Sequence, residues 1–166
     1  MKRLLPIVLL MTLAGCSHTY YVVRHAEKAV PGDGPVMNTP NDPPLSTMGL
    51  QRADALKRVL HDKSIRYIYS TNTIRTRSTA EPLSNLINVP VQTYGPTPDS
   101  AFIQQLKLLK KNTLIVGHSN TIDDIANGLA GEKKVDGDLP ETVYDQIFII
   151  HYSKGGRKIV FERVSY

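Results

Sequence analysis

The chain has 166 residues, of which 41% are hydrophobic and 21% charged, a composition that suits one globular domain with a core of its own. The formal net charge is +5, and the Lys and Arg residues are scattered, with no run of basic and aromatic side chains. This distribution argues against a nucleic-acid-binding protein and is compatible with small anionic substrates.

The first 16 residues, MKRLLPIVLLMTLAGC, resemble a bacterial lipoprotein signal. Two basic residues precede an apolar run, 4–13, that is too short to span a bilayer as a permanent helix. The run leads into LAGC, which is similar to a lipobox. Cys16, the single cysteine, is therefore predicted to be lipidated after removal of a signal peptide, residues 1–15. A plain signal peptide and an N-terminal anchor helix are the alternatives.

A lipid on Cys16 would attach the mature domain, residues 16–166, to a membrane surface and leave no thiol for a disulfide. Ser17 after the cysteine resembles the sorting pattern of outer-membrane lipoproteins in Gram-negative bacteria. We therefore expect a lipid-anchored domain in the cell envelope, on the outer membrane and facing the periplasm. Without the two basic signal residues, 18 basic residues oppose 15 acidic ones, a net charge of +3.

Apolar runs of strand type alternate with helical patterns along the rest of the chain. The first predicted strand, 20–23, is followed by a loop at 30–44 that is rich in Pro, Gly and Asn and long enough to form a lid or substrate loop. The later predicted elements are, in order, a helix at 46–60, a strand at 65–69, a helix at 73–86, a strand at 89–94, a helix over 102–109, a strand at 113–117, a helix at 122–129 and a hairpin formed by 146–153 and 157–164.

This alternation predicts an α/β fold, with a mainly parallel sheet covered by helices on both faces and the C-terminal hairpin as an antiparallel edge. Ligands bind at the carboxyl ends of the strands in such sheets. Arg24 and His25 follow the first strand, and His118 follows the fourth. Arg75 lies near the start of the helix after the second strand. We therefore expect these four side chains to converge at one edge of the sheet.

Two arginines and two histidines at one edge would form a pocket for a doubly charged anion. Ser119 and Asn120 are predicted to open the next helix, where free backbone N–H groups attract anions. A phosphoryl group fits such a pocket best, because guanidinium groups match its oxygens bidentately.

Three motifs in this order resemble those of the histidine phosphatase superfamily, which includes the cofactor-dependent phosphoglycerate mutases. They are RHAEK at 24–28, STNTIRTRSTAEPL at 70–83 and VGHSNT at 116–121, and the segment at 42–56 is also similar to the family. The resemblance runs from Tyr20 to the final hairpin. It implies a three-layer α/β/α sandwich and a phosphohistidine intermediate.

On this resemblance, neutral His25 attacks phosphorus, and water later removes the phosphoryl group from it. Arg24, Arg75 and His118 hold the phosphoryl oxygens and stabilise their charge, while Ser119 and Asn120 complete the binding site. No metal or cofactor is expected, because the arginines supply the positive charge. The predicted activity is hydrolysis of phosphomonoesters, or of another small phosphorylated compound, in the cell envelope.

The residue that protonates the leaving group is less determined by the sequence. Some relatives place an acid directly after the second histidine, where this chain has Ser119. Asp99 falls about where mutase-like relatives carry their acid, and a helix N-cap is its alternative role. Glu27 is close to His25 in the chain, and fixing the loop is its alternative role.

Two other functions stay open at this point. A non-catalytic envelope lipoprotein would keep the phosphate-binding pocket without turnover. A phosphomutase is less favoured, because the chain is short for the extra elements that trap a transferring phosphoryl group and because a mutase is not expected in an exported compartment.

Overall fold

The computed structural model describes residues 17–30, 41–153, 156 and 158–166. The predicted signal peptide, the predicted lipidation site at Cys16 and most of the predicted lid loop lie outside the described residues. The elements are β1 (His18–Arg24), α1 (Thr47–Leu60), β2 (Tyr67–Thr71), α2 (Ile74–Ile87), β3 (Val91–Tyr94), α3 (Ser100–Leu109), β4 (Thr113–Gly117), α4 (Ile122–Ala130), β5 (Gln146–Tyr152) and β6 (Ile159–Ser165).

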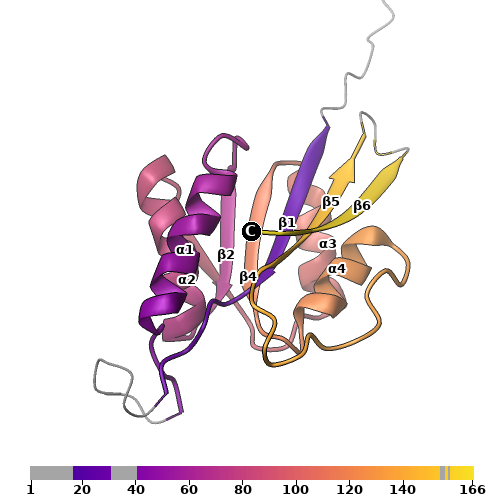
Figure 1. The fold of residues 1–166 in the computed structure, drawn as a ribbon. Coiled ribbons are helices and arrows are strands. Elements are labelled where there is room, and N and C mark those ends of the chain that lie inside the picture. Colours follow the sequence, from indigo (N-terminus) through magenta and orange to yellow (C-terminus); the bar gives the residue numbers. More distant parts are fainter. Residues whose placement is uncertain (1–16, 31–40, 154–155, 157) are drawn as a thin grey trace, which may run out of the picture.

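The strands form one sheet in the order β3-β2-β4-β1-β5-β6 (Figure 1). The pairs β2–β3, β2–β4 and β1–β4 are parallel, whereas β5 runs antiparallel to both β1 and β6. The predicted fold class is therefore confirmed: a mainly parallel sheet carries an antiparallel hairpin at one edge.

Helices cover both faces of the sheet, since successive strand residues point to opposite sides. On one side, Val22 and Ile115 belong to a core cluster that includes Leu106 of α3 and Ile125 of α4. On the other side, alternate residues of the same strands pack with α1 and α2, as Val23 does with Leu56 and Leu83. Figure 1 shows the resulting three layers, with α1 and α2 on one side and α3 and α4 on the other. The strands therefore end at an edge where loops from both layers meet.

The start of α1 is fastened to the segment that follows β1. The Oγ of Ser46 caps the helix by accepting the backbone N–H of Gly49 at 3.0 Å, and the Ser46 N–H donates to the Glu27 carbonyl at 2.9 Å. A Cβ at Gly49 would lie 2.2 Å from that carbonyl oxygen, so only glycine allows the close approach. The loop after β1, which begins with His25, is thereby held in a fixed position.

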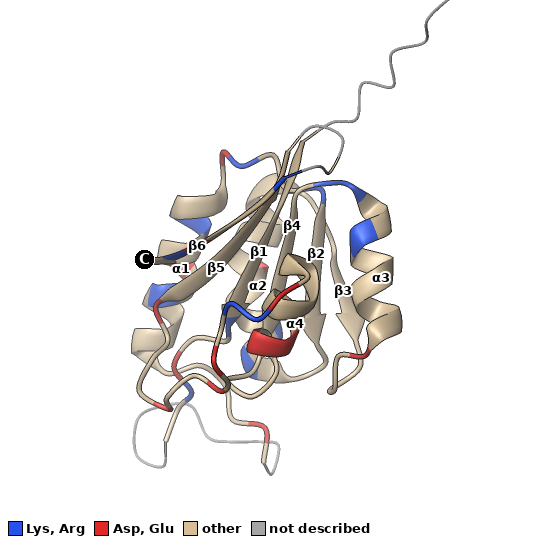
Figure 2. Ribbon diagram, turned by 90° about the vertical axis from the view of Figure 1, so that its right-hand side faces the viewer, with Lys and Arg blue, Asp and Glu red and all other residues tan. Residues whose placement is uncertain are grey.

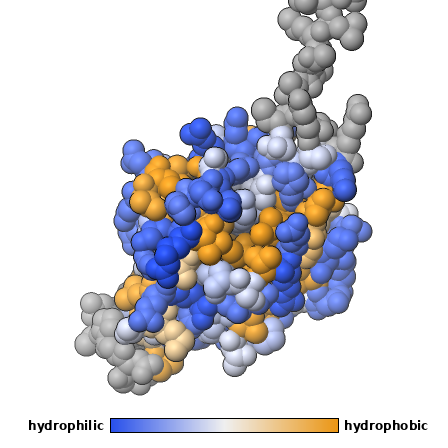
Figure 3. Space-filling model, turned by 45° about the horizontal axis from the view of Figure 1, so that its top comes forward, coloured by the Kyte–Doolittle hydropathy of each residue, from blue (hydrophilic) through white to orange (hydrophobic). Residues whose placement is uncertain are grey.

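Strand β6 of the hairpin forms one edge of the sheet, and most of its residues are exposed. Charged residues on it, such as Glu162 and Arg163, discourage pairing with another chain. Figure 3 shows apolar areas bordered by hydrophilic residues on the face it presents. In Figure 2 the Lys and Arg residues lie on several separate elements and do not gather into one patch. Within the described ranges, no helix is both long and apolar enough to cross a membrane.

Candidate active site

Parallel pairing of β1 and β4 brings the two histidines of the predicted site together. Arg24 lies opposite Gly117 in the register, and the N–H of His25 donates to the Gly117 carbonyl at 2.9 Å. The next residue after Gly117 is His118, and its ring centroid lies 5.4 Å from that of His25. Two residues 93 positions apart in the chain thus become neighbours because their strands end at the same edge.

Gly117 sits in a crowded position at the end of β4. A Cβ there would lie 2.7 Å from the Tyr94 hydroxyl oxygen and 3.0 Å from a methyl carbon of Ile122. The Tyr94 hydroxyl is itself fixed, because it donates to the Val116 carbonyl at 3.2 Å. Glycine at this position lets β4 turn directly into the loop that carries His118.

Helix α2 contributes Arg75 and also fixes the loop after His25. The Thr79 hydroxyl accepts the backbone N–H of Ala26 at 2.9 Å and donates to the Arg75 carbonyl at 2.8 Å. Thr79 is fully buried, so neither hydrogen bond competes with water. One threonine therefore connects the segment of the predicted nucleophile to the helix of a predicted phosphate ligand.

The surroundings of His25 fix its protonation and its tautomer. Its Nδ1 lies 2.7 Å from the Ala26 carbonyl oxygen, which can only accept a hydrogen bond, so Nδ1 carries the proton and Nε2 keeps its lone pair. The side chain is buried, with 4% of the residue exposed. Burial lowers the pKa of His25 to about 3, and the charges of Arg75 and Arg24 add to this effect against the hydrogen bond to Ala26. His25 is therefore a neutral imidazole with a free Nε2, the form that a nucleophile requires.

His118 is oriented by the end of β2. Its Nε2 lies 2.9 Å from the Thr71 hydroxyl, and its Nδ1 lies 3.5 Å from an Arg75 Nη. The Thr71 hydroxyl donates to Thr76, so it accepts from His118, and the imidazole is protonated at Nε2. Burial lowers the pKa of His118 to about 4, with Arg75 and Arg24 contributing in the same direction.

Arg24 is almost completely enclosed, with 1% of the residue exposed. One Nη donates to the carbonyls of Pro140 and Val143 at 2.9 and 3.1 Å, and the other donates to Glu141 Oε2 at 2.9 Å. The Tyr144 ring covers the guanidinium, whose central carbon lies 4.0 Å from the ring centroid. The loop before β5 therefore wraps around the first arginine of the predicted site.

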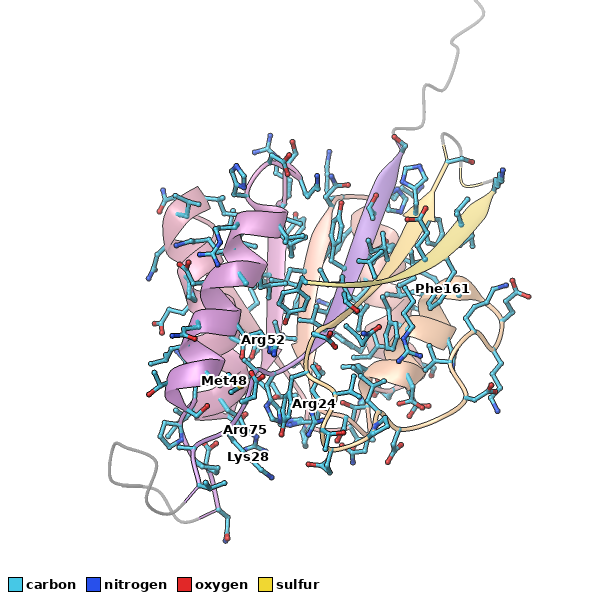
Figure 4. All side chains as sticks on the ribbon, viewed as in Figure 1. Arg24, Lys28, Met48, Arg52, Arg75 and Phe161 are labelled. Carbon is cyan, nitrogen blue, oxygen red and sulfur yellow. The ribbon has the colours of Figure 1, made fainter. Side chains whose placement is uncertain are left out.

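These side chains line one cavity of about 490 Å³ at the carboxyl ends of the strands. Figure 4 shows Arg24, Arg75 and Lys28 close to one another at that end of the sheet. Of the residues predicted from the sequence, the cavity is lined by Arg24, His25, Arg75, His118, Ser119 and Asn120. Such a cavity presents cationic and hydrogen-bonding groups to a small anion, with a buried neutral imidazole among them.

Three carboxylates that line the cavity or pair with its arginines were not predicted. Asp42 pairs with Arg75 at 3.0 Å while accepting the N–H of Ile74 at the start of α2. Glu141 pairs with Arg24, and its other oxygen accepts the Ser119 hydroxyl at 3.0 Å. Asp124 also lines the cavity. Asp42 and Glu141 lie in loops and Asp124 lies in the first turn of α4, and none of the three belongs to a residue spacing that points to this site.

Helix α4 begins at Ile122, after a turn formed by residues 118–121. Ser119 and Asn120 therefore precede the helix by one turn, whereas the sequence predicted that they open it. The first turn of α4 carries Asp123 and Asp124, whose charges already complement the helix dipole. Attraction of an anion in this cavity thus depends on the arginines and on Lys28 more than on the helix start.

Asp99, the predicted proton donor, does not line this cavity. Its carboxylate caps α3 by accepting the Phe102 N–H at 2.8 Å, which is the alternative that the sequence left open. It faces a separate cavity bordered by Tyr69 and Tyr94. The physical reason is local: an aspartate before a helix satisfies an otherwise free N–H, and this hydrogen bond holds the Asp99 carboxylate at the start of α3.

Glu27, the other candidate, is held by Arg52. Both of its oxygens accept the Arg52 Nε–H at 2.8 Å, and an Arg52 Nη lies 2.6 Å from Oε1. Its side chain is 15% exposed and faces a neighbouring cavity beside Met48. This carboxylate therefore fixes the loop after His25 against α1. Within the residues that the structure describes, no group of three or more His, Cys, Asp and Glu side chains could hold a metal ion.

Comparison with known proteins bears on this geometry. Residues 20–95, which include Arg24, His25 and Arg75, match the family model of the histidine phosphatase superfamily (branch 1). No curated protein matches the chain.

Solved structures share the fold at low sequence identity. A putative phosphohistidine phosphatase SixA from Agrobacterium tumefaciens is 15% identical with a TM-score of 0.61, over 89% of this chain and 98% of that one. The protein histidine phosphatase SixA complexed with tungstate is 18% identical with a TM-score of 0.65, over 89% and 96% of the two chains. A phosphoserine phosphatase from Entamoeba histolytica is 16% identical with a TM-score of 0.63, over 90% and 98%.

The family match covers the first arginine-histidine pair and the second arginine, and the remaining histidine completes the same pocket from β4. The three-layer fold is shared with the solved structures over nearly their full length. Residues 20–95 are therefore similar to the histidine phosphatase superfamily (branch 1), and the solved structures share the fold over about nine tenths of the chain.

Proposed function

We propose that the protein is a phosphatase that hydrolyses a small phosphorylated compound through a phosphohistidine on His25. The observation that carries this proposal is the tautomer of His25, a residue that lines the cavity: its Nδ1–H is bound to the Ala26 carbonyl, so Nε2 keeps a free lone pair. Its low pKa keeps that lone pair available at all physiological pH values.

The neighbouring cations stabilise the negative charge of the phosphoryl group. Arg24 and Arg75 bring two permanent positive charges to the cavity that contains His25, and the uncharged His118 can gain a proton at Nδ1 as negative charge develops. Donors fixed by the protein need no reorganisation when negative charge spreads over the phosphoryl oxygens. These groups replace the charge that a metal ion would supply, so we propose a metal-independent reaction.

The test is hydrolysis of an aryl phosphate by the purified full-length chain, with and without a chelator. We expect turnover that the chelator does not change and that His25→Ala abolishes. An acid-labile phosphoenzyme should be trapped from the wild type by rapid quenching and be absent from His25→Ala. His61→Ala, a change at an exposed histidine after α1, is the matched control and should turn over normally.

A second candidate function is a phosphate-ester-binding protein without turnover. The pairing of Arg24 and Arg75 with Glu141 and Asp42 favours it, since both arginines already have anionic partners. Binding of inorganic phosphate without hydrolysis of any ester by the wild type would select this candidate and overturn the phosphatase. The phosphomutase stays less favoured, and transfer of phosphate to an added alcohol in place of water would revive it.

We also propose that the protein works in the bacterial cell envelope, anchored to the outer membrane by lipid on Cys16 and facing the periplasm. The motif LAGC after a short apolar run supports this proposal. Incorporation of a labelled fatty acid into the full-length chain, lost in Cys16→Ser, is the expected result. Equal labelling of both chains, or recovery of the wild type without any membrane fraction, would contradict it.

A further inference from the structure

A leaving alkoxide needs a proton, and neither carboxylate suggested by the sequence can deliver it. Glu27 is held by Arg52, and Asp99 faces a different cavity. Among the described residues that line the phosphate cavity, the carboxylates are Asp124 and Glu141. Glu141 accepts hydrogen bonds from two groups that also line the cavity, Arg24 and Ser119.

Glu141 lies on the solvent-exposed side of the cavity, whereas the nucleophile is buried. Its side chain is 68% exposed, whereas His25 is 4% exposed. In an in-line displacement, the leaving oxygen lies on the side of phosphorus away from the nucleophile. A phosphoryl group attacked by the buried His25 therefore turns its leaving oxygen toward the mouth, where Glu141 lies with Lys28 4.0 Å from its Oε2.

We propose that Glu141 is the general acid that protonates the leaving group, an inference that rests on the proposed phosphatase activity. The carboxylate reaches this role by exchanging partners with the substrate. In the free protein its oxygens accept hydrogen bonds from Arg24 and Ser119, and a phosphoryl group that enters the cavity would accept the same hydrogen bonds.

The exchange of partners also changes the protonation state of Glu141. Without substrate, the hydrogen bond from Ser119 and the charges of Arg24 and Lys28 lower the pKa of Glu141, and the group is ionised. A bound phosphoryl group takes these donors and adds negative charge nearby, and both changes raise the pKa of a carboxyl group. A phosphomonoester has a second pKa of about 6, so its monoanion can bring the required proton into the site.

The reaction has two steps, attack on phosphorus by His25 and then attack on phosphorus by water. The Nε2 lone pair of His25 forms the N–P bond as the P–O bond to the leaving group breaks, and the leaving oxygen takes the proton of the Glu141 carboxyl. In the second step, a water oxygen attacks phosphorus while the Glu141 carboxylate takes a water proton. The N–P bond then breaks, its electron pair returns to Nε2, and phosphate leaves.

The experiment compares an alkyl phosphate with an aryl phosphate in the full-length wild type and in Glu141→Gln. Removal of a general acid should lower kcat/KM for the alkyl ester by about 10²- to 10⁴-fold, because its leaving group is a strong base. The aryl ester, whose leaving group needs no proton, should lose less than about tenfold. Glu162→Gln on the exposed strand β6 is the matched control, and it should change neither rate.

Equal losses on both esters would assign Glu141 to positioning Arg24 and overturn the inference, as would no loss on either. A selective alkyl loss in Asp124→Asn with Glu141→Gln unaffected would transfer the role to Asp124. Absence of turnover in the wild type on both esters is a different failure, that of the proposed function itself.

A second measurement does not depend on turnover. Inorganic phosphate is titrated into the wild type in a calorimeter, in two buffers of different ionisation enthalpy. The difference between the two heats should show proton uptake on binding, and Glu141→Gln should lack this uptake. The same uptake in both proteins would show that Glu141 does not become protonated on binding, and it would overturn the inference even if hydrolysis proceeds.

Discussion

The neutral state of His25 predicts a specific dependence of stability on pH. In the unfolded chain this histidine has an ordinary pKa of about 6.5, whereas burial lowers it to about 3 in the fold. Between these two pH values the unfolded chain binds a proton that the folded chain does not. The free energy of unfolding must therefore fall as the pH falls from 6.5 toward 3.

The size of this effect follows from the linkage relation. Each pH unit inside this window is worth about 1.4 kcal/mol, so His25 alone should remove about 2 to 3 kcal/mol of stability between pH 6.5 and pH 4.5. The side chain is almost fully buried, and solvent screening therefore does little to reduce the effect. His118, whose pKa is also lowered, acts in the same direction.

Urea unfolding of the wild type and of His25→Asn at both pH values isolates the contribution of His25. The asparagine amide can replace the Nδ1–H donor to Ala26 but cannot titrate. Effects of the carboxylates and of His118 occur in both proteins and cancel in the difference. We expect the wild type to lose about 2 to 3 kcal/mol more than the variant. Equal losses would refute the claim that the fold excludes a proton from His25. The exposed His61, changed to Asn, should leave the loss as in the wild type.

Three further predictions test residues that position the loops and helices around the cavity. Gly117→Ala should cost about 1 to 3 kcal/mol of unfolding free energy, because the new methyl group would meet the Tyr94 hydroxyl at 2.7 Å; an unchanged urea midpoint would contradict it. Thr79→Val should cost about 1 to 3 kcal/mol of unfolding free energy and lower kcat on an aryl phosphate, because the buried Ala26 N–H loses its acceptor. Urea unfolding and kinetics measured side by side separate the two effects, and wild-type values in both would show that Thr79 does not hold the loop after His25. Asp99→Ala should cost about 1 kcal/mol through its lost N-cap and leave kcat/KM for both alkyl and aryl esters unchanged, whereas a selective alkyl loss would restore Asp99 as the proton donor.

The order of elements could be read from the sequence because burial leaves a local periodicity. The fourth strand was predicted at 113–117 and lies there, since TLIVG is buried on both faces and reads as one apolar run. The second strand was predicted at 65–69 but occupies Tyr67–Thr71. Its last two residues are polar yet buried, and their hydroxyl groups are hydrogen-bonded within the fold. The partner of Thr71 in this arrangement, His118, lies 47 positions away in the chain, and a contact of that kind cannot be seen in a local pattern.

The sequence alone also determined that the two arginines and two histidines gather around one cavity. Arg24, His25 and His118 follow strands, and the topology of a parallel sheet requires strand ends of this kind to share one edge. The motif order added Arg75 from the helix after β2. These inferences needed only the direction of the strands and the place of each residue along them.

Only the tertiary structure decided the state and the partners of those residues. The tautomer of His25 depends on a 2.7 Å contact with a carbonyl oxygen, and its pKa depends on burial and on the nearby charges of Arg75 and Arg24. Glu141 lies 117 positions from the arginine that it binds, a separation over which no local pattern carries information. Asp99 could have been a cap or an acid by sequence, and the orientation of α3 selected the cap. Residue types and strand ends are local properties, whereas protonation and pairing are set by what folding brings within a few ångströms.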